Sequence, residues 1–312
     1  MIPNPPPSDL PTKIRFDESF FEEEERCNFR VTRRRKELWA ILLDLWQEFD
    51  RVCRKYDLTY YFEGGSLLGA VRHHGFIPWD DDFDVIMFRK DYNRLLEIGP
   101  TEFKHPYFFQ HGFNEPRYCY NHHVKIRNAL TLGEGGSLLT IPTNHGVFFD
   151  VFALDVVNDD LDKVQAQEQE LRKYHQLMYS IVKQFKVSAL SAVNDPNKLH
   201  ETLLKLHHQF EECVSRYENE KTANVSDLVF LFNTGHRITH EVKHFSEPIY
   251  VPFEEFSAPI PSNADAVLRD CYGDDYMTPD QGAPSFHGDL FFDARHSHAE
   301  VLGNIIESLR LK

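Results

Sequence analysis

Apolar residues recur at every third or fourth position in three stretches of the chain. In the first stretch they stand at positions 38, 41, 42, 45, 49, 52 and 53, and the same period marks 171–185 and 203–217. This spacing is typical of amphipathic helices with one buried face. Asn194-Asp195-Pro196 interrupts the pattern between the second and third stretches. The chain is therefore expected to form one early helix that packs on a sheet and a later pair of helices.

Short apolar runs bounded by polar residues predict the strands. They cover residues 60–63, the segment that starts near 82, 147–155 and 229–232. A helix is expected directly after the first run, through Leu67 and Val71. The mixture of strands and helices predicts an α/β (α+β) fold, in which a mixed sheet is flanked by helices.

Composition divides the chain into four parts. Residues 1–30 are Pro-rich and then acidic, which predicts a tail on the surface. Residues 31–160 hold the first helix and most strands and are expected to form the core, with 161–225 as a helical insertion. Residues 226–312 are expected to complete the core and to end in a helix near 298–311.

Four aspartates crowd into five positions at 80, 81, 82 and 84. Two carboxylates about 4 Å apart repel by roughly 4 kcal/mol at an effective dielectric constant of about 20, so such a cluster needs a proton or a cation. Asp82 and Asp84 would share one face of a strand. Oxygen ligands of this kind suit Mg²⁺ or Mn²⁺. Asp80 and Asp81 are interpreted as loop or supporting residues.

Gly64-Gly65-Ser66 precedes the aspartates and opens the short helix. Glycines let backbone N–H groups approach a phosphate, and the helix N-terminus adds partial positive charge. A phosphate cradle followed by paired carboxylates fits metal-assisted phosphoryl transfer. The alternative is an ordinary turn followed by a solvated acidic loop.

A third carboxylate comes from Asp150, which lies inside an apolar strand-like run. A carboxylate in such a run is almost never buried without a partner, which favours a place in the metal site. The alternative is an aspartate at a strand end that faces solvent. Asp155, near the end of the run, is interpreted as a structural or supporting residue.

Net charge and cysteine usage restrict the expected binding partners and the expected cellular compartment. The formal net charge is −15, so no basic face for nucleic acid is expected. The run 33–36 is interpreted as a solvated helix start rather than a contact for glycan or lipid. Five scattered cysteines without a Cys-x-x-Cys pair favour reduced thiols in the cytoplasm. No stretch of 18 apolar residues and no signal-peptide pattern appear, although peripheral contact with the inner face of the membrane stays open.

Several motifs together resemble the LicD/fukutin family of the nucleotidyltransferase-fold superfamily. The central block reads GSLLGAVR at 65–72 and GFIPWDDDFD at 75–84. Residues 123–128 resemble the basic strand of that family, 149–155 its later aspartate strand and 272–277 its closing motif. Phe83, Ser66 and Asp275 depart from the usual pattern, whereas the aspartate pair does not.

The resemblance implies a fold, a reaction and a set of residues. It makes residues 31–160 the catalytic core, with residues 226–312 completing that core and the donor and acceptor pocket. It implies a nucleotidyltransferase-like mixed sheet and transfer of a phospho-alcohol, most often phosphocholine, from a CDP-linked donor such as CDP-choline. The acceptor would be a sugar hydroxyl of a cell-surface or lipid-linked glycan, such as lipopolysaccharide, teichoic acid or capsule. Mg²⁺ or Mn²⁺ would be held by Asp82, Asp84 and Asp150. The donor phosphates would be held by Gly65, Ser66, Arg72, Lys125 and Arg127.

In the expected reaction, the acceptor hydroxyl is deprotonated by Asp150 or by a metal-bound hydroxide. Two other readings stay open. A nucleotidyltransferase would release pyrophosphate from a nucleoside triphosphate, and a glycan-binding subunit would have no catalytic activity.

Overall fold

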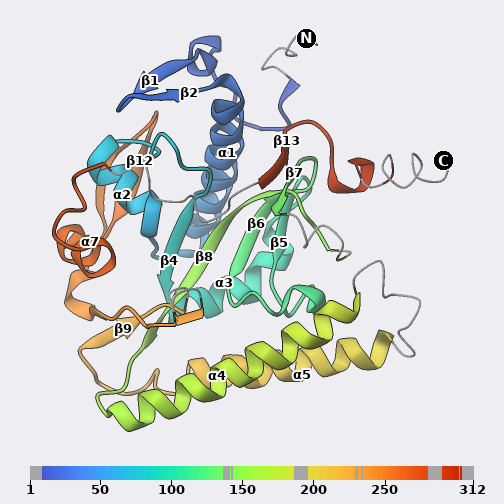
Figure 1. Cartoon of the computed structure of the whole chain (residues 1–312), viewed down its shortest axis with the longest axis vertical. Coiled ribbons are helices and arrows are strands. Elements are labelled where there is room, and N and C mark those ends of the chain that lie inside the picture. The colour runs from blue at the N-terminus through green and yellow to red at the C-terminus, as the bar shows by residue number, and fades with distance from the viewer. Residues whose placement is uncertain are drawn as a thin grey trace.

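The computed structural model describes residues 9–135, 141, 143–185, 196–228, 231–232, 235–279, 290–301 and 303. Its centre is a mixed sheet with helices around it, which confirms the predicted fold class (Figure 1). Among the described residues, no helix combines the length and the apolar character that a membrane span requires.

The longest strand, β8, organises the sheet. It pairs in parallel with β4 along one edge, and along the other edge it pairs first with β6 and then with β9, both antiparallel. β3 lies outside β4, β5 outside β6, and β10 outside β9. The seven strands are β3 (Tyr61–Phe62), β4 (Asp84–Phe88), β5 (Tyr107–Gln110), β6 (Val124–Asn128), β8 (Val147–Val156), β9 (Asn224–Ser226) and β10 (His240–Glu241).

The remaining elements surround this sheet. Three antiparallel pairs lie outside it: β1 (Glu24–Arg26) with β2 (Phe29–Val31), β11 (Ile249–Phe253) with β12 (Phe256–Ile260), and β7 (Leu132–Gly135) with β13 (Leu290–Asp293). The α-helices are α1 (Arg33–Tyr56), α2 (Gly64–His73), α3 (Arg89–Glu102), α4 (Leu161–Val182), α5 (Pro196–Val214) and α7 (Ala264–Tyr272). The 3₁₀ turns are η2 (Glu18–Phe21), η3 (Pro116–Tyr118), η5 (Lys183–Phe185) and η7 (Val242–His244).

Helix α1 covers one face of the sheet. It begins after Thr32, whose side chain accepts a hydrogen bond from the Arg35 amide, and it packs on β6 and β8. Trp46 contacts the Phe83 ring and Phe49 contacts the Phe149 ring edge-on. Because side chains alternate along a strand, the residues next to these phenylalanines in β4 and β8 face the other way.

The N-terminal segment lies on the surface and is anchored to the core at several points. Residues 9–30 contain a hairpin and bury Leu10 and Phe21 against the core. The amides of Lys13 and Ile14 donate to Asp44 Oδ1 of α1, each at 2.8 Å. These apolar anchors and backbone bonds hold the segment in place, although its composition resembles that of a loose tail. Residues 1–8 of the prediction lie outside the described residues.

Helices α4 and α5 form the predicted pair and lie side by side along one end of the molecule (Figure 1). They bury a second hydrophobic cluster with Leu231. The strand predicted at 229–232 is wrong for 231 and 232, which are helical, while 229 and 230 lie outside the described residues. The returning strand is β9, where Val225 pairs with Val156 and Leu231 is left to pack in the helical cluster. The final predicted helix begins at residue 298, but 302 and 304–312 lie outside the described residues.

A buried ion-pair network ties α3 to the sheet and to α5. Arg89 donates to both carboxylate oxygens of Asp155 at 2.6 Å and to Glu211 at 2.9 Å. Asp155 thus has the structural role that the sequence left open. We expect Arg89→Met to lower the free energy of unfolding by about 3–5 kcal/mol, because it leaves two carboxylates buried without their cation. Denaturant unfolding measures this.

The matched control is Arg94→Met, one helix face away on α3, where the guanidinium is 50% exposed and pairs with Glu97. That change should cost less than about 1 kcal/mol. Equal losses for the two variants would contradict the structural role assigned to Arg89.

His207 of α5 predicts a loss of stability in acid. Its side chain is fully buried, and burial together with nearby His208 lowers its pKa to about 3. The unfolded chain therefore takes up the proton first, and stability falls as the pH drops from about 6.5 towards 3, by about 1.4 kcal/mol per pH unit. His207→Leu should flatten this dependence in unfolding measured between those pH values. The exposed-site control His236→Leu should keep the slope of the parent, and an unchanged slope in His207→Leu would contradict the account.

Candidate active site

Three charged residues stand in one row across the middle of the sheet. Asp84 of β4 pairs with Asp150 of β8, and Asp150 pairs with Lys125 of β6. Side chains directly opposite on neighbouring strands share a face, with strands about 4.8 Å apart. This is the face opposite to α1. The structure thus places the aspartate of the second predicted segment beside the aspartate of the first.

The N-terminus of α2 lies against Asp84. The Asp84 amide donates to Ser66 Oγ at 2.8 Å, and the Glu63 amide donates to the Asp84 carbonyl at 3.1 Å. Gly64 has a φ of +52°, and a Cβ there would stand 3.5 Å from Asp84 Oδ2. The turn before the helix and the start of β4 are therefore one unit. Ser66 Oγ therefore accepts a structural hydrogen bond, and its hydroxyl group can still donate one to a ligand.

Asp80 and Asp82 lie close to each other just before the strand. Burial and the neighbouring Asp82 carboxyl raise the pKa of Asp80 well above its ordinary value. A Cβ on Gly65 would stand 2.6 Å from Asp80 Oδ2, which is too close, so the absence of a side chain at Gly65 leaves space for this carboxyl group. β4 begins at Asp84, two residues later than predicted, because the chain before it is drawn towards α1.

Two residues of α1 hold that loop. Trp39 Nε1 donates to the Asp80 carbonyl at 3.3 Å, and the Arg35 guanidinium donates to the same oxygen. The sequence pointed to a solvated helix start at 33–36, but Arg35 is half-buried next to the aspartate loop. It supplies positive charge near Asp80 and Asp81, which its place in a basic run did not reveal.

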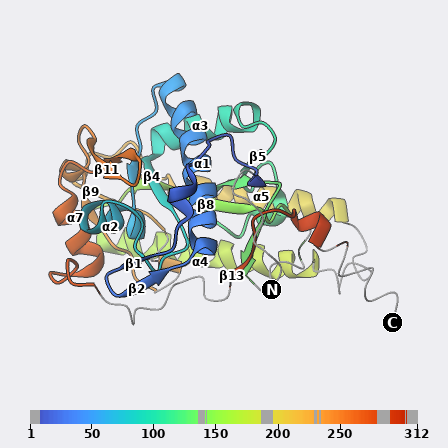
Figure 2. The same cartoon turned by 90° about the horizontal axis from the view of Figure 1, so that it is seen from above.

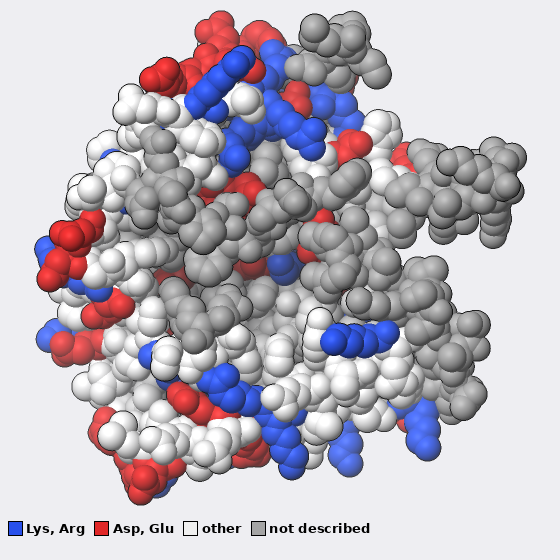
Figure 3. Space-filling view, viewed as in Figure 1, with Lys and Arg blue, Asp and Glu red and all other residues white. Residues whose placement is uncertain are grey.

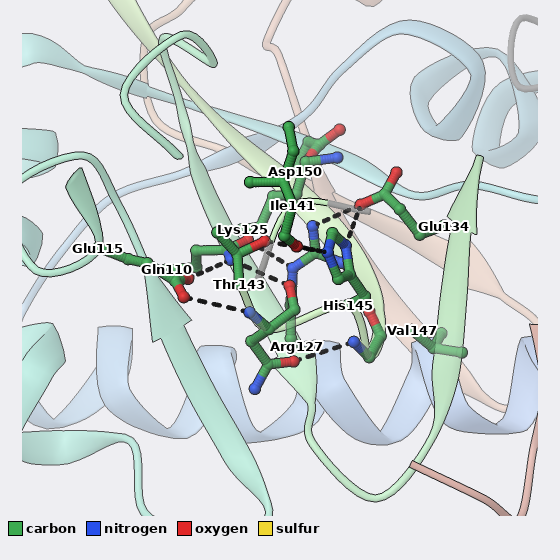
Figure 4. Close-up of polar contacts among 12 residues, drawn as sticks. Gln110, Glu115, Lys125, Arg127, Glu134, Ile141, Thr143, His145, Val147 and Asp150 are labelled. Carbon is green, nitrogen blue, oxygen red and sulfur yellow. Dashed lines mark hydrogen bonds and ion pairs between the residues drawn. The ribbon is translucent and has the colours of Figure 1, made fainter. Parts of the chain in front are cut away.

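Asp150 lies between the aspartates of β4 and two basic residues that come before it in the chain. Its Oδ1 is 3.3 Å from Lys125 Nζ and 3.2 Å from His123 Nε2. The Lys125 ammonium also stands 3.2 Å from the centroid of the Phe148 ring. Burial lowers the pKa of Lys125, and Asp150 works against that shift. Lys125 is therefore a buried cation next to the predicted metal ligand (Figure 4).

Arg127 is engaged within the protein. It donates to the Gly146 carbonyl at 2.8 Å and to Glu134 at 2.9 Å, and its Nε donates to Gln110 (Figure 4). Burial alone would raise the pKa of Glu134, but His145 and Arg127 hold it far below its ordinary value. With three protein partners, Arg127 stabilises the β6 edge of the site. Donor contact by Arg127 stays a prediction.

Arg72 lies at the far end of α2 from the phosphate cradle. Seven residues of helix separate it from Gly65, a rise of about 10 Å. Its guanidinium donates to the Tyr276 carbonyl at 2.6 Å and fastens the segment after α7. The helix thus separates Arg72 from the glycines that precede it, and its contact with donor phosphate stays a prediction.

The charged row extends to a residue that the sequence analysis did not single out. The amide of Glu63 bonds to Asp84, in line with the β3–β4 register, so Glu63 is the next carboxyl after Asp84. It is 4% exposed. The sequence did contain a signal for Glu63, because this residue follows directly on the apolar strand and precedes the glycines.

On the surface, basic side chains gather above this region, over β1, β2 and the start of α1, while acidic side chains show in the middle of the face (Figure 3).

The donors at this site are the carboxylates of aspartates that occupy neighbouring positions on two strands and on the loop before one of them. Asp84 and Asp150 are strand neighbours, and Asp80 and Asp82 affect each other's charge. Such a set fits Mg²⁺ or Mn²⁺ better than a thiophilic metal. The residues present therefore fit the implied ion.

Comparison with known proteins points to the same part of the chain. Residues 57–130 match the model of the LicD/FKTN/FKRP nucleotidyltransferase domain, which includes Asp84 and Lys125 but not Asp150. Over 69 residues the chain is 42% identical to lipopolysaccharide cholinephosphotransferase LicD of Haemophilus influenzae, covering 22% of this chain and 25% of that protein. Over 45 residues it is 42% identical to ribitol 5-phosphate transferase FKRP of Homo sapiens, covering 14% of this chain and 9% of that protein. The chain thus matches a quarter or less of the length of either relative.

Proposed function

We propose that this protein transfers a phospho-alcohol from a CDP-linked donor to a sugar hydroxyl of a glycan, because residues 57–130 match the LicD/FKTN/FKRP nucleotidyltransferase domain. Phosphocholine is the favoured group, and lipopolysaccharide or another cell-surface glycan the favoured acceptor, in line with the bacterial relative. The observation that carries the proposal is the pairing of Asp84 with Asp150 beside the N-terminus of α2.

Asp82, Asp84 and Asp150 would hold the divalent ion. When bound, that ion supplies charge neutralisation on the donor diphosphate and orients it for in-line attack. The N-terminus of α2 offers backbone N–H groups and partial positive charge to the phosphates at the same place.

Two basic residues serve the transfer itself. Lys125 is buried and already lies next to Asp150, so it can offset negative charge that develops on the transferred phosphoryl group or on the leaving CMP. His123 contacts the same carboxylate and helps to orient it. Asp150, held from one side by these two groups, is the residue placed to accept the proton of an incoming sugar hydroxyl. A CDP-linked donor is a cytoplasmic metabolite, so the proposed reaction belongs in that compartment.

Product analysis tests the proposal. The protein is incubated with Mg²⁺ and one of CDP-choline, CDP-ethanolamine, CDP-ribitol, CDP-glycerol or CTP, together with glycan acceptors, and the products are followed by phosphorus NMR. We expect CMP and a phosphodiester-modified glycan from one of the donors. Pyrophosphate released from CTP instead would support a nucleotidyltransferase. Glycan binding without turnover of any nucleotide would support a silent binding subunit, and either result would overturn the proposal.

A further inference from the structure

A second group of ligand-type side chains lies next to the aspartate row. Glu63, His240 and Cys271 each offer one ligand atom, and these atoms all lie within 4.8 Å of one another. Glu63 follows β3, His240 belongs to β10 and Cys271 to α7, so the group joins three segments that are distant in the sequence. α2 and α7 lie together on one side of the molecule in both views (Figures 1 and 2).

Glu63 is the most unusual member of the group. Although its side chain is buried, neither carboxylate oxygen has a hydrogen-bond partner. Burying an unpaired carboxylate is costly, so such a group takes a proton or a cation. Burial and, after it, the nearby Asp227 carboxyl raise the pKa of Glu63 to about 8. A proton is thus one way of meeting this cost, and a metal ion is the other.

His240 is oriented as metal-binding histidines are. Its ring is 1% exposed, and Nδ1 lies 2.9 Å from Asp270 Oδ2. The other ring nitrogen, Nε2, stands 4.0 Å from Cys271 Sγ. A carboxylate on one ring nitrogen fixes the tautomer and leaves the other nitrogen for a metal. Cys271 is half-buried, and burial followed by Glu63 raises the pKa of its thiol, as expected before a cation arrives.

We propose that Glu63, His240 and Cys271 form a binding site for a thiophilic divalent ion of the zinc class. Carboxylate, imidazole and thiolate are the ligands that zinc takes in proteins, and three of them leave a fourth position for water or for Asp227. Zinc bonds of about 2.0–2.3 Å in a tetrahedron place ligand atoms about 3.3–3.8 Å apart. The ligand atoms, which are at most 4.8 Å apart, need to approach one another by at most about 1.5 Å, which is within the reach of side-chain rotation.

This site differs in chemistry and in task from the oxygen site of the aspartates. Nitrogen and sulfur ligands favour zinc over Mg²⁺. An ion there would fasten α7 and β10 to Glu63 at the N-terminus of α2, and the first turn of that helix holds Asp84 through Ser66. It would also neutralise Glu63, the carboxyl next to Asp84. Its task is therefore to position the phosphate cradle.

A second group of possible metal ligands among the described residues is not proposed as a metal site. The ligand atoms of His111, His207 and Glu211 also lie within 4.8 Å of one another. There, however, Arg89 already stands 2.9 Å from Glu211 and supplies the positive charge.

Cobalt titration of the full chain tests the site, with Co²⁺ alone as the probe. The protein is stripped with a chelator, dialysed and titrated, and thiolate-to-cobalt charge transfer is followed in the near ultraviolet. We expect one equivalent to bind with such a band and to be displaced by Zn²⁺. The band reports a sulfur ligand, so it is independent of the aspartate site and of the proposed transfer reaction.

Three variants identify the ligands. Cys271→Ser should lose the band, while Cys27→Ser, at an exposed thiol outside the group, should keep it. Asp270→Asn keeps all three ligands and should weaken binding about 10–100-fold. Circular dichroism establishes that each variant is folded. A parent protein without a thiolate band, or a band that persists in folded Cys271→Ser, would overturn the proposal and leave a protonated Glu63 as the explanation.

Discussion

Asp84→Asn should lower the rate of transfer by at least about 10³-fold while the protein stays folded. The change removes the negative charge of a side chain that stands beside Asp150 and at the N-terminus of α2. It keeps the size of the side chain and the hydrogen bond from the backbone amide of residue 84 to Ser66 Oγ. Loss of a preorganised charge at the reacting phosphate costs several kcal/mol of transition-state stabilisation. Turnover of the donor identified by product analysis, with circular dichroism as the folding check, measures the effect.

The control for that variant is Asp159→Asn. Asp159 lies just beyond the end of β8, is exposed, and undergoes the same change of charge at a distance from the site. It should keep the parent rate. Turnover of Asp84→Asn within a few-fold of the parent would show that the carboxylate is not part of the catalytic machinery.

Lys125→Met should lower kcat/KM by about 10²–10³-fold. The ammonium is buried, lies 3.3 Å from Asp150 Oδ1 and stands over the Phe148 ring. Methionine keeps most of the side-chain volume and removes the one charge, so the loss reports electrostatic stabilisation rather than packing. Steady-state kinetics separates the two ways in which the charge acts, because phosphate binding appears in KM and transition-state stabilisation in kcat.

Lys13→Met provides the matched control. Lys13 also pairs with a carboxylate, Glu48, and stands over an aromatic ring, Tyr107, but its side chain is 61% exposed and belongs to the N-terminal segment rather than to the candidate active site. It should leave kcat/KM unchanged. A Lys125→Met enzyme that matches this control would remove Lys125 from the proposed mechanism.

Sequence periodicity predicts the long helices well. The apolar positions of all three long helices recur every three or four residues over several turns. The buried residues of α4 follow that spacing, whereas α1 is buried at every position from Lys36 to Trp46 because other elements cover it on more than one side. Prediction fails where a short apolar segment could pack either in the sheet or in the helical cluster. Leu231 lies in an apolar run that resembles a strand, yet it packs with α4 and α5, while the less apolar β9 takes the place in the sheet.

The site was predictable in part. The alternation around Phe83 places Asp82 and Asp84 away from the core, and the buried run around Asp150 marks that residue as exceptional. The pairing of Asp84 with Asp150 depends on the parallel register of β4 and β8, which local sequence does not contain. The basic residues show most clearly that sequence does not reveal which partners a charged side chain meets. Arg72 and Arg127 meet protein partners, whereas Arg35, from a run that resembles solvated surface, lies at the aspartate loop.

The central claim is that the carboxylates of β4 and β8 hold a divalent ion next to a nucleotide diphosphate. Phosphorus NMR of CDP with trace Mn²⁺ tests it most directly, because a bound paramagnetic ion broadens only the phosphorus signals that lie near it. The account predicts strong broadening of both CDP signals with the parent protein and with Asp159→Asn, and none beyond that of free Mn²⁺ with Asp84→Asn. Equal broadening with folded Asp84→Asn and with the parent protein would contradict it.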